Sequence, residues 1–164
     1  MAADPLETAW KMHGALADWT GKADGKASFA LTLQATVLAA LGVLAGSGRV
    51  FGDVGTGPAL FLLWLGASLL GAGASFAVAA ISPNLRKERR GPQEGDDFLY
   101  FGHLRTWEPV DLEVALREND PLPALTRQLV VMSEIAWIKH RRVQWSLSLA
   151  AAGAVALALT AAVG

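Results

Sequence analysis

The sequence contains no cysteine, which excludes disulfide bonds, thiolate metal sites and cysteine nucleophiles. Charge is also scarce, because only 18% of the 164 residues are Asp, Glu, Lys or Arg, against about a quarter in ordinary soluble domains. The 14 basic and 15 acidic residues nearly balance, and this argues against nucleic acid as a partner, since a basic surplus would be needed to meet the phosphates. The hydrophobic residues, 52% of the chain, are concentrated in a few segments.

Three long stretches of the chain carry no charged side chain. They are residues 27–48, residues 54–85 and residues 143–164. A helix rises about 1.5 Å per residue and a hydrocarbon core is roughly 30 Å thick, so about 20 residues suffice to span it. In so short a chain, the remaining polar residues are too few to cover three such runs in a water-soluble fold. We therefore expect three transmembrane helices, the first two at about 28–46 and 58–82.

The basic residues that flank these stretches predict the topology. They are Lys22 and Lys26 before the first, Arg86, Lys87, Arg89 and Arg90 after the second, and Lys139, Arg141 and Arg142 before the third. Positive flanks favour the cytoplasm, so residues 1–26 and 86–142 are expected there, with the N-terminus inside. The glycine-rich turn at 47–57 and the C-terminus would face outward. Because no span holds an acid or a base, a proton relay or an ion-coupled transporter is not expected.

The two cytoplasmic pieces are expected to be helical. Apolar residues recur at spacings of three and four over residues 2–20 and 122–142, and each segment is predicted to run into the span that follows it. A shorter helix is expected at 110–118, and the charged, glycine- and proline-containing segment 86–97 is expected to be a linker. The predicted fold is all-α: an integral membrane bundle of three transmembrane helices with a small cytoplasmic helical cap.

Small residues recur at every fourth position of the second and third spans. They are Ala67, Gly71, Ser75 and Ala79, followed by Ser148, Ala152, Ala156 and Thr160. Such spacing lets membrane helices approach closely, either within one chain or between chains. On this basis we expect a homo-oligomer.

Two polar groups near the spans could meet an anion. Residues 22–28, which include Asp24, Lys26 and Ser28, stand at the start of the first span, where the lysines serve either an anion or interfacial anchoring. Arg127, Gln128, Glu134 and Lys139 project from the last cytoplasmic helix, where they form either part of a site or a solvated face.

A third group combines aromatic rings with an imidazole. Tyr100, Phe101 and His103 could stack on a nucleobase and contact a phosphate or carbonyl, or they could pack in the core of the cap. The histidines, His13, His103 and His140, are too scattered in the sequence to predict a metal site. No P-loop, nucleophile elbow or zinc-protease motif is present, so we predict neither a catalytic site nor a metal site.

Three short segments taken together resemble one family. Residues 23–28 (ADGKAS), residues 100–103 (YFGH) and residues 125–139, with their LxRQ and SEIAxxK elements, match the transmembrane effectors of Pycsar, a bacterial anti-phage system. The resemblance extends over about residues 10–150, and the order of the segments relative to the spans makes the combination more specific than any one of them.

The resemblance implies a function and a ligand. Effectors of this family act beside a cyclase that makes cyclic UMP or cyclic CMP upon infection, and the nucleotide activates the effector to impair the inner membrane and cause abortive infection. The family resemblance therefore implies a non-enzymatic, multi-pass protein of the bacterial inner membrane that needs no cofactor beyond this ligand. Its motif positions, the candidate nucleotide-binding residues, are Asp24, Lys26, Ser28, Tyr100, Phe101, His103, Arg127, Gln128 and Lys139. The β-roll of the usual cyclic-nucleotide-binding domain has no counterpart in this sequence.

Two other functions remain open from the residues alone. One is a structural or assembly subunit of a membrane complex, which would bind no nucleotide. The other is a small membrane-bound enzyme using Glu134, His103 or His140, which would show turnover that a single replacement abolishes.

Overall fold

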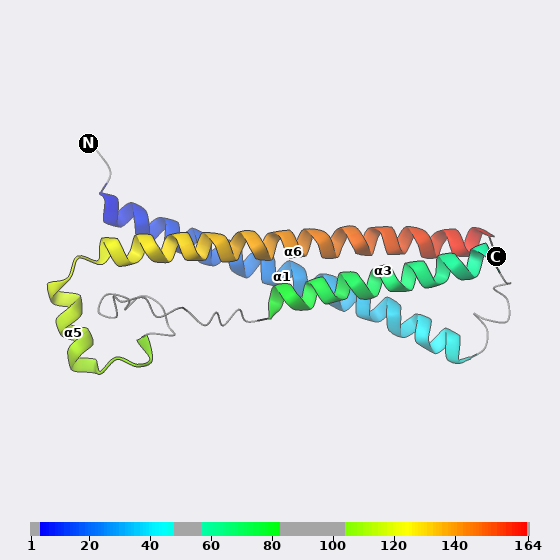
Figure 1. The fold of residues 1–164 in the computed structure, drawn as a ribbon, viewed down its shortest axis with the longest axis horizontal. Coiled ribbons are helices and arrows are strands. Elements are labelled where there is room, and N and C mark those ends of the chain that lie inside the picture. The colour runs from blue at the N-terminus through cyan, green and yellow to red at the C-terminus, as the bar shows by residue number, and fades with distance from the viewer. Residues whose placement is uncertain (1–3, 48–56, 83–103, 164) are drawn as a thin grey trace. The chain divides into compact units, whose positions relative to one another are not determined.

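The regular structure of the chain is entirely helical. The computed structural model describes residues 4–47, 57–82 and 104–163, and within these ranges it contains α-helices and no strand. The main helices are α1 (Pro5–Gly46), α3 (Pro58–Ile81), α5 (Pro109–Glu118) and α6 (Pro121–Val163) (Figure 1). The all-α prediction is confirmed, and the helical segments before the first and third spans continue into them without a break as α1 and α6.

Some predicted segments lie outside the described residues. These are most of the outward turn, at 48–56, the linker at 86–97, and the aromatic segment up to residue 103. The short helix expected at 110–118 is present and begins one residue earlier.

Each of these four helices begins at a proline. The prolines are Pro5, Pro58, Pro109 and Pro121. Proline suits the first helical position because its fixed φ fits a helix and its missing N–H would have no partner there. In α1 and α6 an aspartate precedes the proline and caps the helix: the backbone N–H of Leu6 donates to Asp4 at 3.1 Å, and that of Leu122 donates to Asp120 at 3.0 Å.

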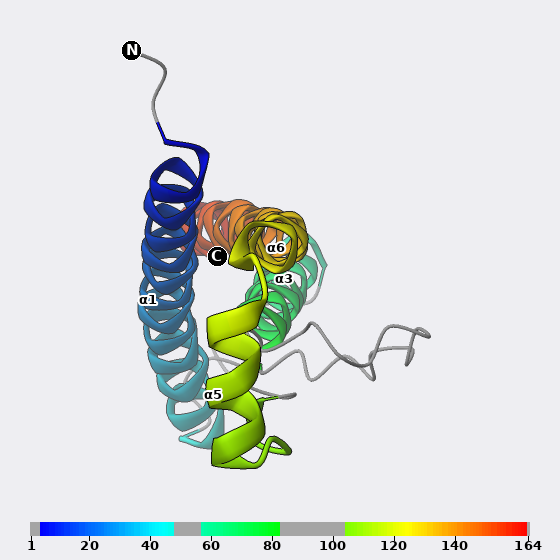
Figure 2. The ribbon, with the colours of Figure 1, turned by 90° about the vertical axis from the view of Figure 1, so that its left-hand side faces the viewer.

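The described chain forms two compact units. The first comprises residues 1–20 and 83–137, and the second comprises residues 21–82 and 138–164, so α1 and α6 each contribute to both. In the first unit the beginning of α1 packs on the beginning of α6 (Figure 2). The core of this contact is apolar and consists of Ala9, Leu16, Leu125, Leu129 and Ala136, with Leu6, Leu122 and Met132 against it.

The second unit is an up-down-up arrangement of the three spans. α3 runs beside the second half of α6 (Figure 1). Their backbones approach closely at Gly66 and Gly153. A Cβ added to Gly66 would lie 3.0 Å from the carbonyl oxygen of Gly153, and one added to Gly153 would lie 2.9 Å from that of Gly66. The two glycines therefore permit a helix contact that no larger residue allows, as is typical of helices that associate in lipid.

The small-residue stripes predicted from the sequence are only partly the packed faces. In α3 the buried positions alternate spacings of four and three, and they are Ala59, Leu63, Gly66, Leu70, Gly73, Ala77 and Ala80. The predicted stripe included Ser75, which is exposed, and in α6 it included Ser148 and Ala152, also exposed. A strict spacing of four turns by about 40° at each step and leaves the interface, whereas alternating three and four stays on it.

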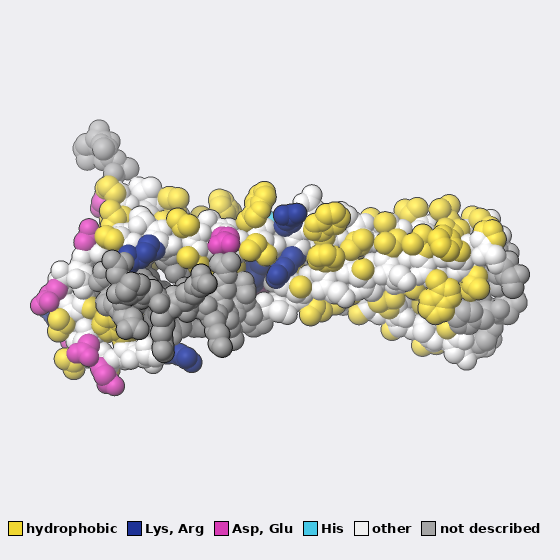
Figure 3. Space-filling model, viewed as in Figure 1, with side chains coloured by type: hydrophobic (Ala, Val, Ile, Leu, Met, Phe, Trp, Pro, Cys, Tyr) yellow, Lys and Arg dark blue, Asp and Glu magenta, His cyan; other side chains and the backbone are white. Residues whose placement is uncertain are grey.

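The surface of the three spans is apolar and points outward. In the most hydrophobic 18-residue window of α1, α3 and α6, only 11%, 28% and 22% of the residues are buried. Large side chains such as Phe29, Phe61 and Val155 are more than half exposed. In Figure 3 hydrophobic side chains cover the visible face of the spans. Three helices are long and apolar enough to cross a bilayer, and an apolar surface this extensive belongs in lipid, so the chain is a membrane protein.

Candidate functional site

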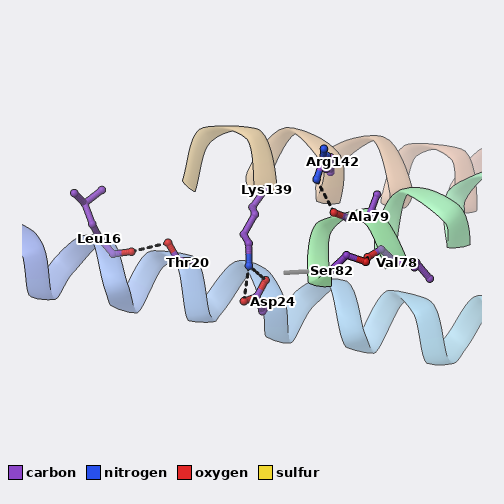
Figure 4. Close-up of polar contacts among 8 residues, drawn as sticks. All are labelled: Leu16, Thr20, Asp24, Val78, Ala79, Ser82, Lys139 and Arg142. Atoms are coloured by element: carbon purple, nitrogen blue, oxygen red, sulfur yellow. Dashed lines mark hydrogen bonds and ion pairs between the residues drawn. The ribbon is translucent and has the colours of Figure 1, made fainter. Parts of the chain in front are cut away.

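Polar contacts join all three spans at one end of the second unit. The clearest contact is an ion pair between α1 and α6, in which the Lys139 Nζ donates to both carboxylate oxygens of Asp24, at 2.6 and 2.8 Å (Figure 4). The Lys139 side chain is only 13% exposed and that of Asp24 is 37% exposed. The pair therefore joins two helices through residues that are 115 positions apart in sequence. Water reaches the Asp24 carboxylate more easily than the Lys139 ammonium.

The same end of the unit also ties in α3. The Arg142 Nη1 donates to the carbonyl oxygen of Ala79 at 2.6 Å, in the last turn of α3 (Figure 4). The backbone N–H and the hydroxyl of Ser82 both donate to Val78, at 2.9 and 2.8 Å. The last carbonyls of a helix lack partners within it, so Arg142 and Ser82 supply donors that would otherwise have to come from water.

This geometry fixes the relation between the spans. The uncharged runs of α1 and α6 begin at the end of the second unit where the uncharged run of α3 finishes. The first span is therefore entered, the second left and the third entered on the same side of the three spans. The basic flanks of the sequence had predicted this shared side.

The predicted nucleotide-binding residues fall into three groups. Asp24, Lys26, Ser28 and Lys139 belong to the second unit, Arg127 and Gln128 belong to the first, and Tyr100, Phe101 and His103 lie outside the described residues. Of the described ones, the structure brings together Asp24 and Lys139.

These residues also differ in how far they are open to solvent. Lys26, Ser28 and Arg127 are exposed, and Gln128 is half-buried. Lys139 does not lie on a solvated face, which had been one of the two interpretations of its helix, because most of its side chain is covered and its ammonium is paired.

Of the three residues suggested for an enzyme, Glu134 and His140 are exposed on α6, and His103 lies outside the described residues. Glu134 lies in the first unit and His140 in the second. Within residues 4–47, 57–82 and 104–163, no three His, Cys, Asp or Glu side chains are grouped so that they could hold a metal ion. The arrangement of the described residues thus offers a charge pair and exposed cations rather than an acid, a base and a nucleophile in contact.

Sequence reasoning missed two polar contacts inside the second unit. One is the bond from Arg142 to α3, since a boundary arginine looks the same in sequence whether it meets water or a helix end. The other joins Gln34 of α1 to Ser146 of α6: both are buried, and the Gln34 Nε2 donates to the Ser146 hydroxyl at 3.1 Å. A lone glutamine in an uncharged run was the available signal for the second contact.

An aromatic pair lies in the same region of the spans. Phe76 of α3 and Trp145 of α6 are stacked, with ring centroids 6.5 Å apart and planes inclined by 28°. Trp145 is 51% exposed and lies three residues beyond Arg142, a position that suits a ring anchored at a membrane–water interface.

Comparison with known families gives one match over nearly the whole chain. The model of PycTM, the Pycsar effector protein domain, matches residues 8–164, which include both units and all three candidate spans. Comparisons with curated proteins and with solved structures gave no match.

Proposed function

The chain belongs to the Pycsar effector protein family, and from this premise we propose that cyclic UMP or cyclic CMP activates it to impair the integrity of the bacterial inner membrane. Membership makes the protein a membrane effector of anti-phage defence. The proposal adds the signal, a nucleotide supplied by a partner cyclase, and the outcome, abortive infection of the cell.

One structural observation carries the proposal. Two of the three spans are the later parts of α1 and α6. The first parts of the same two helices belong to the other unit of the chain. A ligand that favours one arrangement of those first parts acts on the same two helices that enter the lipid. It shifts the equilibrium by the difference between its affinities for the two arrangements.

We propose that the nucleotide site is built from the motif residues. The roles follow from charge and shape: cationic side chains meet the phosphate, and aromatic rings with the imidazole contact the base. The candidates are Asp24, Lys26, Ser28, Tyr100, Phe101, His103, Arg127, Gln128 and Lys139. Lys26 and Arg127 are exposed to solvent. Lys139 is paired with Asp24 and would have to exchange that partner for the phosphate.

We further propose a cytoplasmic N-terminus and a homo-oligomer. Lys139 and Arg142 lie at the end of the second unit where the spans of α1 and α6 begin, and a cytoplasmic position for that end accords with the distribution of Lys and Arg in membrane proteins. The spans leave most of their surface uncovered within one chain, which gives other copies room to pack against them.

The direct test is calorimetric titration of the detergent-purified full chain with cyclic UMP, cyclic CMP and cyclic AMP. We expect one or both pyrimidine nucleotides to bind and cyclic AMP not to bind. Absence of binding by all three would overturn the proposal and favour a structural subunit.

A second test follows membrane potential in cells. Co-expression with a pyrimidine cyclase should depolarise them, while an inactive cyclase should not. Lys26→Ala and His103→Ala should relieve the effect, whereas Lys11→Ala, which changes an exposed lysine paired with Glu7, should not. Equal depolarisation by all three variants would remove Lys26 and His103 from the site.

A further inference from the structure

A polar contact is buried among the three spans of the second unit. Gln34 is 2% exposed and lies eight residues beyond Lys26, about 12 Å along α1 into its uncharged run. Its Nε2 donates to the Ser146 hydroxyl at 3.1 Å and approaches the Ser146 carbonyl oxygen at 3.5 Å. Ser146 itself is fully buried, so both polar groups are removed from solvent.

The third side of this contact is the backbone of α3. A Cβ added to Gly73 would lie 2.9 Å from the Gln34 Oε1 and 3.0 Å from the Ser146 carbonyl oxygen. The glycine therefore brings α3 against the amide and leaves no space for a methyl group between them. We call Gln34, Gly73 and Ser146 the intramembrane node.

The node is incompletely satisfied. The Gln34 Oε1 is buried and has no hydrogen-bond partner among the described residues. The Oε1 lies on the Gly73 side of the amide, within 2.9 Å of where a Cβ on that glycine would stand. A buried amide oxygen without a hydrogen-bond donor destabilises the packing that buries it, and the penalty disappears when water reaches the oxygen.

We propose that Gln34 is a gating residue: the closed packing of α3 against α1 and α6 is weakened at the intramembrane node, and activation separates α3 from the node and hydrates the Gln34 amide. This inference rests on the proposed function in that it assigns where the membrane unit opens. Two opposite effects follow. Removing the amide should stabilise the closed packing, and inserting a methyl group at Gly73 should push α3 away and mimic activation.

The chain offers a matched control for the methyl insertion. Gly71 lies two residues before Gly73 in α3, and a Cβ added there meets nothing within 4 Å. Gly71→Ala therefore makes the same chemical change in the same helix without touching the node. For the amide, Gln34→Leu removes both polar atoms at similar volume, and Ser146 can then bond a carbonyl of its own helix.

The absence of cysteine permits a direct readout of opening. Ala77 is fully buried, one helical turn from Gly73, and Ala77→Cys places a single thiol there in an otherwise thiol-free chain. In proteoliposomes without nucleotide, we measure its modification by a water-soluble methanethiosulfonate reagent. We expect Gly73→Ala to label roughly tenfold faster than the parent, as overpacking of this degree should shift the opening equilibrium, and Gly71→Ala to label at the parent rate.

Two results would overturn the inference. Equal labelling rates for Gly73→Ala and Gly71→Ala would show that α3 does not close on the node. Faster labelling in Gln34→Leu would show that the amide fastens the bundle rather than weakening it, and this second test does not depend on how well Gly73→Ala folds. Because neither measurement uses nucleotide, failure of the proposed signal appears separately, as an unchanged rate when cyclic UMP or cyclic CMP is added to the parent.

Discussion

The ion pair between Asp24 and Lys139 should respond asymmetrically to removal of its two partners. The Lys139 side chain is 13% exposed and that of Asp24 is 37% exposed, so water can replace a lost partner for the carboxylate more readily than for the ammonium. Asp24→Ala leaves the mostly covered Lys139 ammonium without its carboxylate partner. Lys139→Met keeps the apolar stem of the lysine and leaves a carboxylate that water can reach. We therefore expect Asp24→Ala to destabilise the protein more.

The exposed fractions set the size of the effect. Solvent-exposed pairs contribute about 0.2–1 kcal/mol, and removing one partner of a fully buried pair costs about 3–5 kcal/mol. This half-buried pair lies between those limits, so we expect a loss of about 2 kcal/mol for Asp24→Ala and about 1 kcal/mol for Lys139→Met. Alanine favours a helix over aspartate by a few tenths of a kcal/mol, so part of the first loss is offset and the asymmetry is a minimum.

The assay is reversible unfolding of the full chain in mixed micelles with increasing dodecyl sulfate. Lys11→Met provides a control of matched distance, because Lys11 and Glu7 also approach to 2.6 Å but are 73% and 63% exposed; its loss should stay below about 0.5 kcal/mol. The double variant Asp24→Ala/Lys139→Met should be more stable than the sum of the single losses predicts, since it leaves no stranded charge. Additive losses, or a larger loss from Lys139→Met, would refute the reasoning.

The remaining predictions concern packing. Leu125 is fully buried between α1 and α6, so Leu125→Ala should lower the free energy of unfolding by about 2–5 kcal/mol. Val130 is 69% exposed on the same helix, so Val130→Ala should change the free energy of unfolding little. Equal losses for the two variants would contradict the assigned core. Gly66→Ala should cost about 1–3 kcal/mol because its Cβ would meet the Leu157 side chain at 2.7 Å, whereas Gly71→Ala should be neutral or slightly stabilising; the same unfolding titration measures both, and a neutral Gly66→Ala would argue against the close helix contact.

The spans and the long helices could be predicted because they depend on local properties of the sequence. An uncharged run of more than 20 residues is visible without knowing what it packs against. The continuity of α1 through residues 20–27 and of α6 through residues 137–143 was predicted from the helical periodicity that leads up to each span, although Gly21 and Gly25 lie in the first of these segments. The shared side of the charged ends followed from counting basic residues.

The contacts within the bundle could not be predicted in the same way. Asp24 and Lys139 were both chosen from motif resemblance, but that they pair with each other depends on the register of α1 against α6, which no local pattern records. The small-residue stripe predicted in α3 lies on a neighbouring face, because positions four residues apart turn gradually around the helix. The buried face instead repeats every seven residues, as Gly66 and Gly73 do. Gln34 matters because Gly73 of α3 and Ser146 of α6 lie beside it, and the sequence around Gln34 does not record these two neighbours.

The distribution of these contacts bears on how a resting effector can be both closed and easily opened. Lipid supplies no hydrophobic force between spans, so the bundle depends on close backbone contacts and on a few polar bonds. At the charged end the polar groups have partners from all three spans, and at the node one polar atom has none within the described residues. The bundle is therefore held firmly at the end where the spans of α1 and α6 begin, and weakly about 12 Å further in. Moving a two-state equilibrium from mostly closed to mostly open takes about 5.5 kcal/mol of differential binding. That amount is a large share of the total binding free energy of a micromolar ligand, about 8 kcal/mol. Under the proposed activation, the unsatisfied Gln34 amide oxygen would lower the free energy that the nucleotide has to supply.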